Sequence, residues 1–304
     1  MKVLITGAAG FVGAYLSDEL EKFGHTLFKT DLANAEYKID LLDKEQVKKG
    51  IDEISPDGII HLAGQSSVGL SWKNPQLTTN INVCGTLNIL DAVRESGKDI
   101  RIVVIGSSDE YGKVSLEDCP IKETQPLAPV NPYAVSKCTQ ETMALLYAKA
   151  YGMDIVFTRS FSHSGPGQKK GFVVPDFCSE VAATKFGEKN VVKVGNLQAK
   201  REIADVRDVV RAYRLILEKG KSGEIYNVGC GKAYVIADIL DMVIGLSQNE
   251  IEVVCDKSKM RPIDLPLIQG DISKLCKETG YCPKYSIEET IADTYKYWLD
   301  LENV

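Results

Sequence analysis

The chain has 304 residues, of which 44% are hydrophobic and 26% charged, a composition typical of a globular protein with a sizeable core. Its formal net charge of −6 argues against nucleic acid or an anionic membrane surface as a partner. Eight cysteines without a CxxC pair and three histidines predict neither a disulfide framework nor a metal site. No apolar window reaches about 18 residues, and glycines interrupt the short apolar run at the N-terminus, so we expect a cytoplasmic protein without a membrane span.

Short apolar runs alternate with amphipathic segments through the first half of the chain. The runs predict strands over residues 2–6, 26–30, 58–62, 101–105 and 154–159. The amphipathic segments predict helices over residues 12–23, 76–96 and 133–151, each followed directly by glycine. Strand and helix in alternation indicate an α/β fold with a doubly wound parallel sheet of the Rossmann type.

The second half is less regular. Strands are predicted over residues 191–194, 201–206 and 224–228, and helices over 205–218, 233–245 and 287–301. Ser286 and Glu289 form a capping box before the last helix. We therefore expect one domain from residues 1–160 plus about 203–229, and a smaller, discontinuous domain from about 161–202 and 230–304.

A glycine turn follows the first predicted strand, with Gly7, Gly10 and Gly13 in a GxxGxxG spacing. Bare glycines let the backbone approach a diphosphate, whose charge is favoured at a helix N-terminus. Asp31 ends the second predicted strand, where a carboxylate accepts hydrogen bonds from an adenosine ribose and repels a 2′-phosphate. The pattern predicts a nicotinamide dinucleotide, with NAD(H) favoured and NADP(H) possible; a helix cap or solvated loop residue is the alternative interpretation of Asp31.

Other segments lie where the rest of such a cofactor passes. The residues expected to contact it are Phe11, Val12, Asp40, Leu41, Leu62, Ala63 and Gly64. His61 precedes three of them, and a packed histidine is as good an interpretation there as a functional one.

Tyr133 and Lys137 lie one helical turn apart on the same face, and Ser107 follows the fourth predicted strand. An adjacent ammonium favours the phenolate, so the pKa of Tyr133 is expected to fall from about 10. Tyr133 can then exchange a proton with a substrate oxygen to which Ser107 donates a hydrogen bond. A YxxxK pair alone is also common on ordinary helix surfaces, so the interpretation depends on the glycine turn and the serine together.

These motifs resemble the extended short-chain dehydrogenase/reductases that act on nucleotide sugars. The matching segments are TGAAGFVG, HLAG, GSSDEYG, NPYAVSK, RSFSHSGPGQ and REIADVRDVVRAY. The resemblance implies that Ser107, Tyr133 and Lys137 are catalytic and that Lys137 also holds the nicotinamide ribose. It also implies that the first domain binds NAD(P) and the second binds the nucleotide sugar.

Within that group, SHSGPGQ, GFVVPDF and MRPIDLPLIQGDISKL are most similar to GDP-6-deoxy-4-keto-D-mannose reductases, and next to GDP-mannose 4,6-dehydratases. The implied reaction is NAD(P)H-dependent reduction of the 4-keto group of GDP-4-keto-6-deoxy-D-mannose to GDP-D-rhamnose, with Tyr133 as proton donor. Asp109 stands where the dehydratases carry a catalytic Glu, so a dehydratase or epimerase with Asp109 as extra acid/base stays open. If strand alternation continues past Ser107, Glu110 faces away from Asp109. A non-catalytic nucleotide-binding or redox-sensing protein is the third possibility.

The resemblance also implies contacts with a GDP-sugar. The expected substrate residues are Ser108, Asp109, Ser162, Val173, Arg201 and Arg261, with Ser162 standing where relatives usually carry Asn. Arg159 is a weaker diphosphate candidate because a structural role fits it equally well. Residues 172–177 line a pocket in one interpretation and belong to the core in the other. Family members pair the helices corresponding to 76–96 and 133–151 into a four-helix bundle, so a homodimer is expected.

Overall fold

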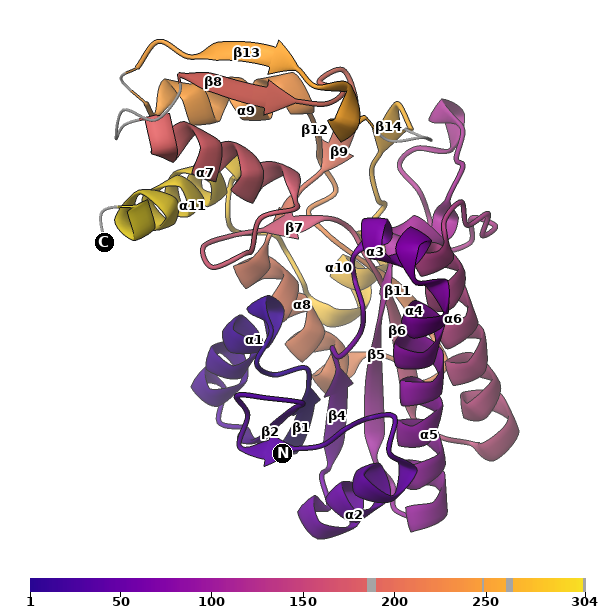
Figure 1. Cartoon of the computed structure of the whole chain (residues 1–304). Helices are drawn as coiled ribbons and strands as arrows, with labels where there is room; N and C mark the ends of the chain where they lie inside the picture. Colours follow the sequence, from indigo (N-terminus) through magenta and orange to yellow (C-terminus); the bar gives the residue numbers. More distant parts are fainter. Residues whose placement is uncertain (185–189, 248, 261–264, 303–304) are drawn as a thin grey trace.

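The computed structural model describes residues 1–184, 190–247, 249–260 and 265–302. Its lower lobe in Figure 1 is a seven-stranded sheet in the order β11-β6-β5-β4-β1-β2-β3, and every pair of neighbours is parallel. The strands are β1 (Lys2–Thr6), β2 (Thr26–Asp31), β3 (Tyr37–Lys38), β4 (Gly58–His61), β5 (Arg101–Ser107), β6 (Ile155–Ser160) and β11 (Ile225–Val228). The predicted doubly wound parallel sheet is confirmed.

Helices cover both faces of this sheet, which explains why its strands are unbroken apolar runs in the sequence. Alternate residues of β5 point to opposite sides: Val103 joins a core cluster with α1 (Phe11–Lys22) and α8 (Val206–Lys219), and Val104 joins another. The second cluster is formed with α2 (Lys44–Ile54), α5 (Gly85–Ser96) and α6 (Pro132–Tyr151). Each fully buried Val or Ile contributes about 1.5–3 kcal/mol relative to exposure, so the two clusters hold the sheet between its helices.

Two predictions in the second half of the chain are wrong in detail. The predicted strand 201–206 is divided into β9 (Lys200–Glu202) and β10 (Ala204–Asp205), which pair with different partners. The predicted helix 233–245 begins as β12 (Ala233–Val235), antiparallel to β9, and only then continues as α9 (Ile236–Gly245). Tyr234 and Val235 are residue types that favour strands, and β9 lies beside them as a pairing partner, so this segment is extended and the helix begins after it.

The predicted helix 76–96 is also not continuous. It consists of α4 (Pro75–Thr79), a π-helical segment (Asn80–Cys84) and α5, after the short helix α3 (Val68–Lys73). Such π segments interrupt α-helices mostly where side chains are needed in a particular direction. Here the segment turns Asn82 inward, where it is fully buried.

The upper lobe in Figure 1 packs α7 (Val173–Thr184), α9 and α11 (Ile287–Glu302) beside a parallel pair, β8 (Val191–Val194) and β13 (Glu252–Cys255). The remaining elements are β7 (His163–Ser164), β14 (Leu267–Ile268) and α10 (Ser273–Thr279). This lobe has its own apolar cluster, whereas α8 and β11 return to the sheet lobe. The division at the residue boundaries given above stays a prediction.

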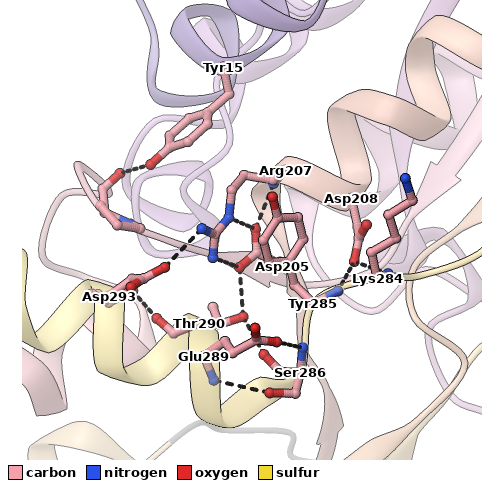
Figure 2. A network of polar contacts seen from close by, with 12 residues as sticks. Tyr15, Asp205, Arg207, Asp208, Lys284, Tyr285, Ser286, Glu289, Thr290 and Asp293 are labelled. Carbon is pink, nitrogen blue, oxygen red and sulfur yellow. Dashed lines mark hydrogen bonds and ion pairs between the residues drawn. The ribbon is translucent and has the colours of Figure 1, made fainter.

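A polar network fastens α8 to α11 (Figure 2). The Arg207 guanidinium donates to both Asp205 oxygens, at 2.8 and 2.7 Å, and also pairs with Asp293 at 2.8 Å. Thr290 donates its hydroxyl hydrogen to the same Asp205 carboxylate at 2.7 Å. The bidentate pair fixes the direction of the Arg207 guanidinium, and the Arg207–Asp293 and Thr290–Asp205 contacts then join α8 to α11 between the two lobes. In the described residues, no helix is long and apolar enough to cross a membrane.

Candidate active site

The glycine turn connects β1 to α1, and its glycines are required by close backbone contacts. Gly7 has φ +74°, and a Cβ there would lie 2.7 Å from the backbone nitrogen of Ala63; a Cβ on Gly13 would lie 2.5 Å from the Ala8 carbonyl oxygen. Gly10 caps α1 without a side-chain hydrogen bond, and the first turn carries no acidic residue. The N–H groups and dipole of that helix end therefore suit an anionic group such as a diphosphate.

The other predicted cofactor residues surround this turn. Phe11, Val12 and Leu62 are half-buried against the first core cluster, and Ala63 and Gly64 follow β4 directly. A Cβ on Gly64 would lie 3.5 Å from the Lys137 ammonium nitrogen, so the HLAG segment reaches the predicted catalytic residues. The structure thus brings the glycine turn, the HLAG segment and Lys137 into one region.

Asp31 lies at the end of β2, beside the glycine turn. Its carboxylate accepts hydrogen bonds from the backbone N–H groups of Ala9 at 3.1 Å and Leu32 at 2.7 Å. Asp40 instead accepts from the Leu42 N–H at 2.9 Å, and Leu41 lies against Gly85 of α5. Asp31 is therefore not a helix cap, and its position suits an adenosine ribose.

His61 is a packed histidine. It is 1% exposed, with Nδ1 2.7 Å from the Thr6 hydroxyl and Nε2 2.9 Å from the Thr86 hydroxyl. Burial, with the nearby Lys137 charge, lowers its pKa to about 3, so it is neutral at physiological pH.

The structure brings Ser107, Tyr133 and Lys137 together. Ser107 ends β5, while Tyr133 and Lys137 lie in the first turns of α6, which begins at Pro132 after an Asn131 cap. The Ser107 side chain lies near enough to the Tyr133 phenol to lower its pKa, and the Lys137 ammonium donates to the Ile105 carbonyl oxygen at 2.8 Å. Two elements distant in sequence thus place the three side chains at one edge of the sheet.

The predicted fall in the pKa of Tyr133 is wrong for this arrangement. Burial raises the pKa of Tyr133 well above its ordinary value, the Asp109 charge raises it further, and the nearby Ser107 side chain opposes the shift. Burial also lowers the pKa of Lys137 to about 8. Desolvation of the phenolate outweighs attraction to the ammonium, so Tyr133 is held in its protonated form.

Ser108, Asp109 and Glu110 lie in a 3₁₀ turn (Ser108–Tyr111), so strand alternation does not continue past Ser107. Glu110 turns inward, is fully buried, and accepts a hydrogen bond from the Ser107 N–H at 2.7 Å. Ser108 is buried as well, whereas Asp109 lies near enough to Tyr133 to affect its titration. The signal for this turn is the capping box around Ser107, visible in the sequence as Ser and Glu three positions apart.

The predicted substrate residues lie on several segments of the upper lobe. Ser162 is exposed and its carbonyl accepts the Ala204 N–H at 2.9 Å, while Val173 begins α7 and packs on the upper-lobe cluster. Arg201, on β9, donates to the Leu265 carbonyl oxygen at 2.6 Å. Arg261 lies outside the described residues.

Two further candidates belong to the core. Arg159 is 4% exposed and pairs with Glu141, so a structural role fits it better. Residues 172–177 mostly begin α7, and Val174 and Phe177 lie in the upper-lobe cluster.

Aromatic contacts that no sequence pattern indicates join the glycine turn to the upper lobe. The Phe11 ring stacks on His163 of β7, with centroids 6.5 Å apart and planes inclined by 11°. One turn along α1, the Tyr15 hydroxyl donates to the Pro166 carbonyl oxygen at 2.8 Å, a contact visible in Figure 2. The cofactor side of the site is thereby in direct contact with the predicted substrate loop.

Known proteins resemble this chain over almost its whole length. A family model described as GDP-mannose 4,6 dehydratase matches residues 4–294. GDP-6-deoxy-D-mannose reductase of Pseudomonas aeruginosa is 34% identical over 98% of this chain and 97% of its own length.

Two solved structures share the fold. RMD from Pseudomonas aeruginosa complexed with NADPH has a TM-score of 0.91 and 32% identity, covering 99% of both chains. UDP-glucose 4-epimerase of Thermus thermophilus in complex with NAD has a TM-score of 0.87 and 30% identity, covering 98% of this chain and 99% of the other. The fold and the matches define an NAD(P)-dependent enzyme of the extended short-chain dehydrogenase/reductase class. The chain belongs to the GDP-mannose 4,6-dehydratase family.

Proposed function

We propose that the protein reduces the 4-keto group of GDP-4-keto-6-deoxy-D-mannose to give GDP-D-rhamnose, using NAD(P)H. The observation that carries the proposal is the buried Tyr133, held protonated beside Ser107 and one turn before Lys137. A reductase needs a proton donor at this position, because the carbonyl oxygen becomes an alkoxide. The name of the Pseudomonas relative, which is similar along nearly the whole chain, supports the same substrate class.

The residues present fit the dinucleotide. The glycine turn and the α1 N-terminus would hold the diphosphate, Asp31 the adenosine ribose, and Lys137 the nicotinamide ribose. The bound cofactor supplies hydride chemistry. Tyr133 gives its proton to the substrate oxygen, Ser107 donates a hydrogen bond to that oxygen, and the Lys137 charge favours the phenolate that remains.

The second candidate function is that of a 4,6-dehydratase, which must also remove a proton from the sugar ring. The observation that favours it is Asp109, whose carboxylate lies close enough to Tyr133 to raise its pKa. Asp109 is one methylene shorter than the glutamate expected in dehydratases, so its carboxylate is placed less far into the site. We assign Asp109, with Ser108, Ser162, Val173, Arg201 and Arg261, to the binding of the sugar nucleotide.

The experiment that separates the two functions offers GDP-mannose alone, and then the 4-keto-6-deoxy intermediate with NADH or NADPH. The proposal expects reduced cofactor to be consumed one for one, and only with the keto sugar. Conversion of GDP-mannose without added reductant would instead establish the dehydratase. The assay must test both NADH and NADPH, because Asp31 favours NADH whereas the Pseudomonas structure contains NADPH.

Tyr133→Phe removes the proton donor and keeps the ring. We expect turnover to fall by about 10²- to 10⁴-fold, with cofactor binding and thermal stability close to those of the wild type. Val192→Ala, in the upper-lobe core, is the control: it should lower the stability of the fold but keep the Tyr133 phenol, so it shows how much turnover is lost through instability alone. Unchanged turnover in Tyr133→Phe would refute the role assigned to Tyr133.

We further propose a homodimer through a four-helix bundle built from residues 76–96, which span α4, the π-helical segment and α5, and from α6 of two copies. Support comes from α6, whose outer face exposes Val135 and Leu146 to 50% and 54%. In a two-fold symmetric dimer, each copy would bury both side chains against the other copy, and the burial of this apolar surface favours association. The cytoplasm is the proposed location, supported by eight free cysteines.

A further inference from the structure

A buried chain of hydrogen bonds runs from Lys137 to β1, and Gln140 is its first link. Gln140 lies one turn after Lys137 on α6 and is 1% exposed. Its Oε1 accepts a hydrogen bond from the Lys137 ammonium at 2.8 Å, and its Nε2 donates to the Thr86 hydroxyl at 2.7 Å. Because an ammonium only donates, the amide has one possible orientation.

The remaining links have fixed directions as well. The Thr86 hydroxyl donates its one hydrogen to the Asn82 carbonyl oxygen at 2.7 Å, so it accepts from both Gln140 and His61. His61 therefore carries its proton on Nε2, and its Nδ1 accepts from the Thr6 hydroxyl at 2.7 Å. Each of these bonds then has one donor and one acceptor, and together they join β1, β4, α5 and α6.

This arrangement determines where the Lys137 ammonium points. Two of its three N–H groups are directed to the Ile105 carbonyl oxygen and to Gln140. The third is left for the region beside Gly64, where a Cβ would lie 3.5 Å from the ammonium nitrogen. A lysine side chain that can adopt several rotamers loses conformational entropy when it binds a ligand. The two hydrogen bonds already restrict the Lys137 side chain, so it loses less conformational entropy on binding.

We propose that Gln140 is a positioning residue, which orients the Lys137 ammonium and ties it through Thr86 and His61 to the strands that carry the glycine turn and the HLAG segment. The inference rests on the proposed function for its catalytic meaning. The effect of Gln140 on the position and pKa of the Lys137 amine can be measured without any assay of activity.

The proposal has a signature in pH. The Gln140 amide oxygen accepts a hydrogen bond from the Lys137 ammonium and therefore favours the charged form of the lysine, which raises its pKa. Burial disfavours the charged form and lowers the same pKa. The titratable groups that face Lys137 are Glu110 from the 3₁₀ turn, His61 from β4, and Tyr133 from its own helix. His61 is neutral and Tyr133 protonated near neutral pH, so neither favours the ammonium. Burial and the nearby Glu141 raise the pKa of Glu110, so Glu110 favours the ammonium only in its ionised form, whereas the Gln140 oxygen accepts from the ammonium whatever the state of Glu110.

Two substitutions of similar size test this control in opposite directions. Gln140→Met removes the acceptor, and we expect the pKa of the Lys137 amine to fall by about one unit. Gln140→Glu places a carboxylate there, and the pKa is expected to rise by at least as much. Thr86→Val, which loosens the amide without touching the lysine, is expected to give a smaller fall. Thr294→Val, a buried threonine that donates within α11, is the control for general loss of a buried hydroxyl.

The first measurement is the rate at which acetic anhydride modifies Lys137 as a function of pH, followed by mass spectrometry on the full-length protein without ligand. This titration requires no activity. The second is the pH profile of NADPH-dependent reduction of the keto sugar, in which Gln140→Met should move the alkaline limb down by about one unit while KM for the sugar stays within about twofold.

Opposite shifts for the Met and Glu variants support the proposal, because simple damage to packing would not change sign between them. Shifts in the same direction, or a Lys137 titration equal to that of the wild type in both, overturn it. If the wild-type protein fails to reduce the keto sugar, the proposed function fails, and the labelling titration still decides whether Gln140 controls Lys137.

Discussion

Removing Arg159 should destabilise the protein strongly, because it would leave a buried carboxylate without its partner. The guanidinium donates to both Glu141 oxygens, at 2.8 and 2.7 Å, and the two side chains are 4% and 6% exposed. It also donates to the Glu123 carbonyl oxygen at 2.9 Å and lies 4.8 Å from the Tyr111 ring centroid. Arg159 therefore joins β6, α6 and the loop before α6 at one point.

Breaking such a pair on one side costs about 3–5 kcal/mol, whereas replacing both partners by apolar residues is often neutral. With an unfolding entropy of about 2.1 cal/mol/K per residue over 304 residues, Arg159→Met should lower Tm by about 5 to 8 °C. In Arg159→Met/Glu141→Leu we expect most of this loss to be recovered. About 1–2 kcal/mol should remain, since the contacts with the Glu123 carbonyl and the Tyr111 ring are not restored.

The assay is thermal unfolding of the two single variants and the double variant, followed by circular dichroism, with the coupling free energy taken from the cycle. If the double variant is as unstable as Arg159→Met, an unpaired carboxylate is not the cause. If Arg159→Met unfolds like the wild type but loses affinity for a sugar nucleotide, Arg159 is a substrate ligand and its structural assignment is wrong.

Two further predictions concern assembly and pH. Val135→Glu and Leu146→Glu should each convert the proposed dimer to a monomer in light scattering, whereas Leu301→Glu, at an exposed position of α11, should not. A wild-type monomer at high concentration would contradict the bundle. Because the pKa of His61 is about 3 in the folded protein and about 6.5 when unfolded, the unfolded state binds the proton first as the pH falls. The wild type should therefore lose about 2 kcal/mol of stability between pH 6.5 and 5 from this residue, and a His61→Gln variant with the same slope would contradict the buried neutral assignment.

The parts of the molecule that the sequence predicted well depend on local patterns. Strands buried on both faces are continuous apolar runs, so β1 and β5 were visible without partners. The glycine turn and the pair Tyr133 and Lys137 have fixed spacing within single elements, and the structure indeed places them at one edge of the sheet.

The parts that it did not predict depend on distant neighbours. Residues 233–235 form a strand because β9 lies beside them, and although Tyr234 and Val235 favour strands, the sequence does not reveal that partner. The pKa of Tyr133 is set by how deeply α6 and β5 bury the phenol, and an ammonium one turn away does not determine that balance. Gln140 looks like an ordinary polar residue until packing brings it to Lys137.

The place of β11 in the sheet has a consequence for synthesis of the chain. Strand β6 is buried along its whole length between β5 and β11, yet β11 begins only at Ile225. At a ribosomal rate of about 5–20 residues per second, β11 is synthesised several seconds after β6, and the edge of β6 is unpaired during that interval. During that time it is an unpaired template for other chains, so a fragment that ends before Ile225 should aggregate, and chaperone occupancy of the nascent protein should be highest over this interval.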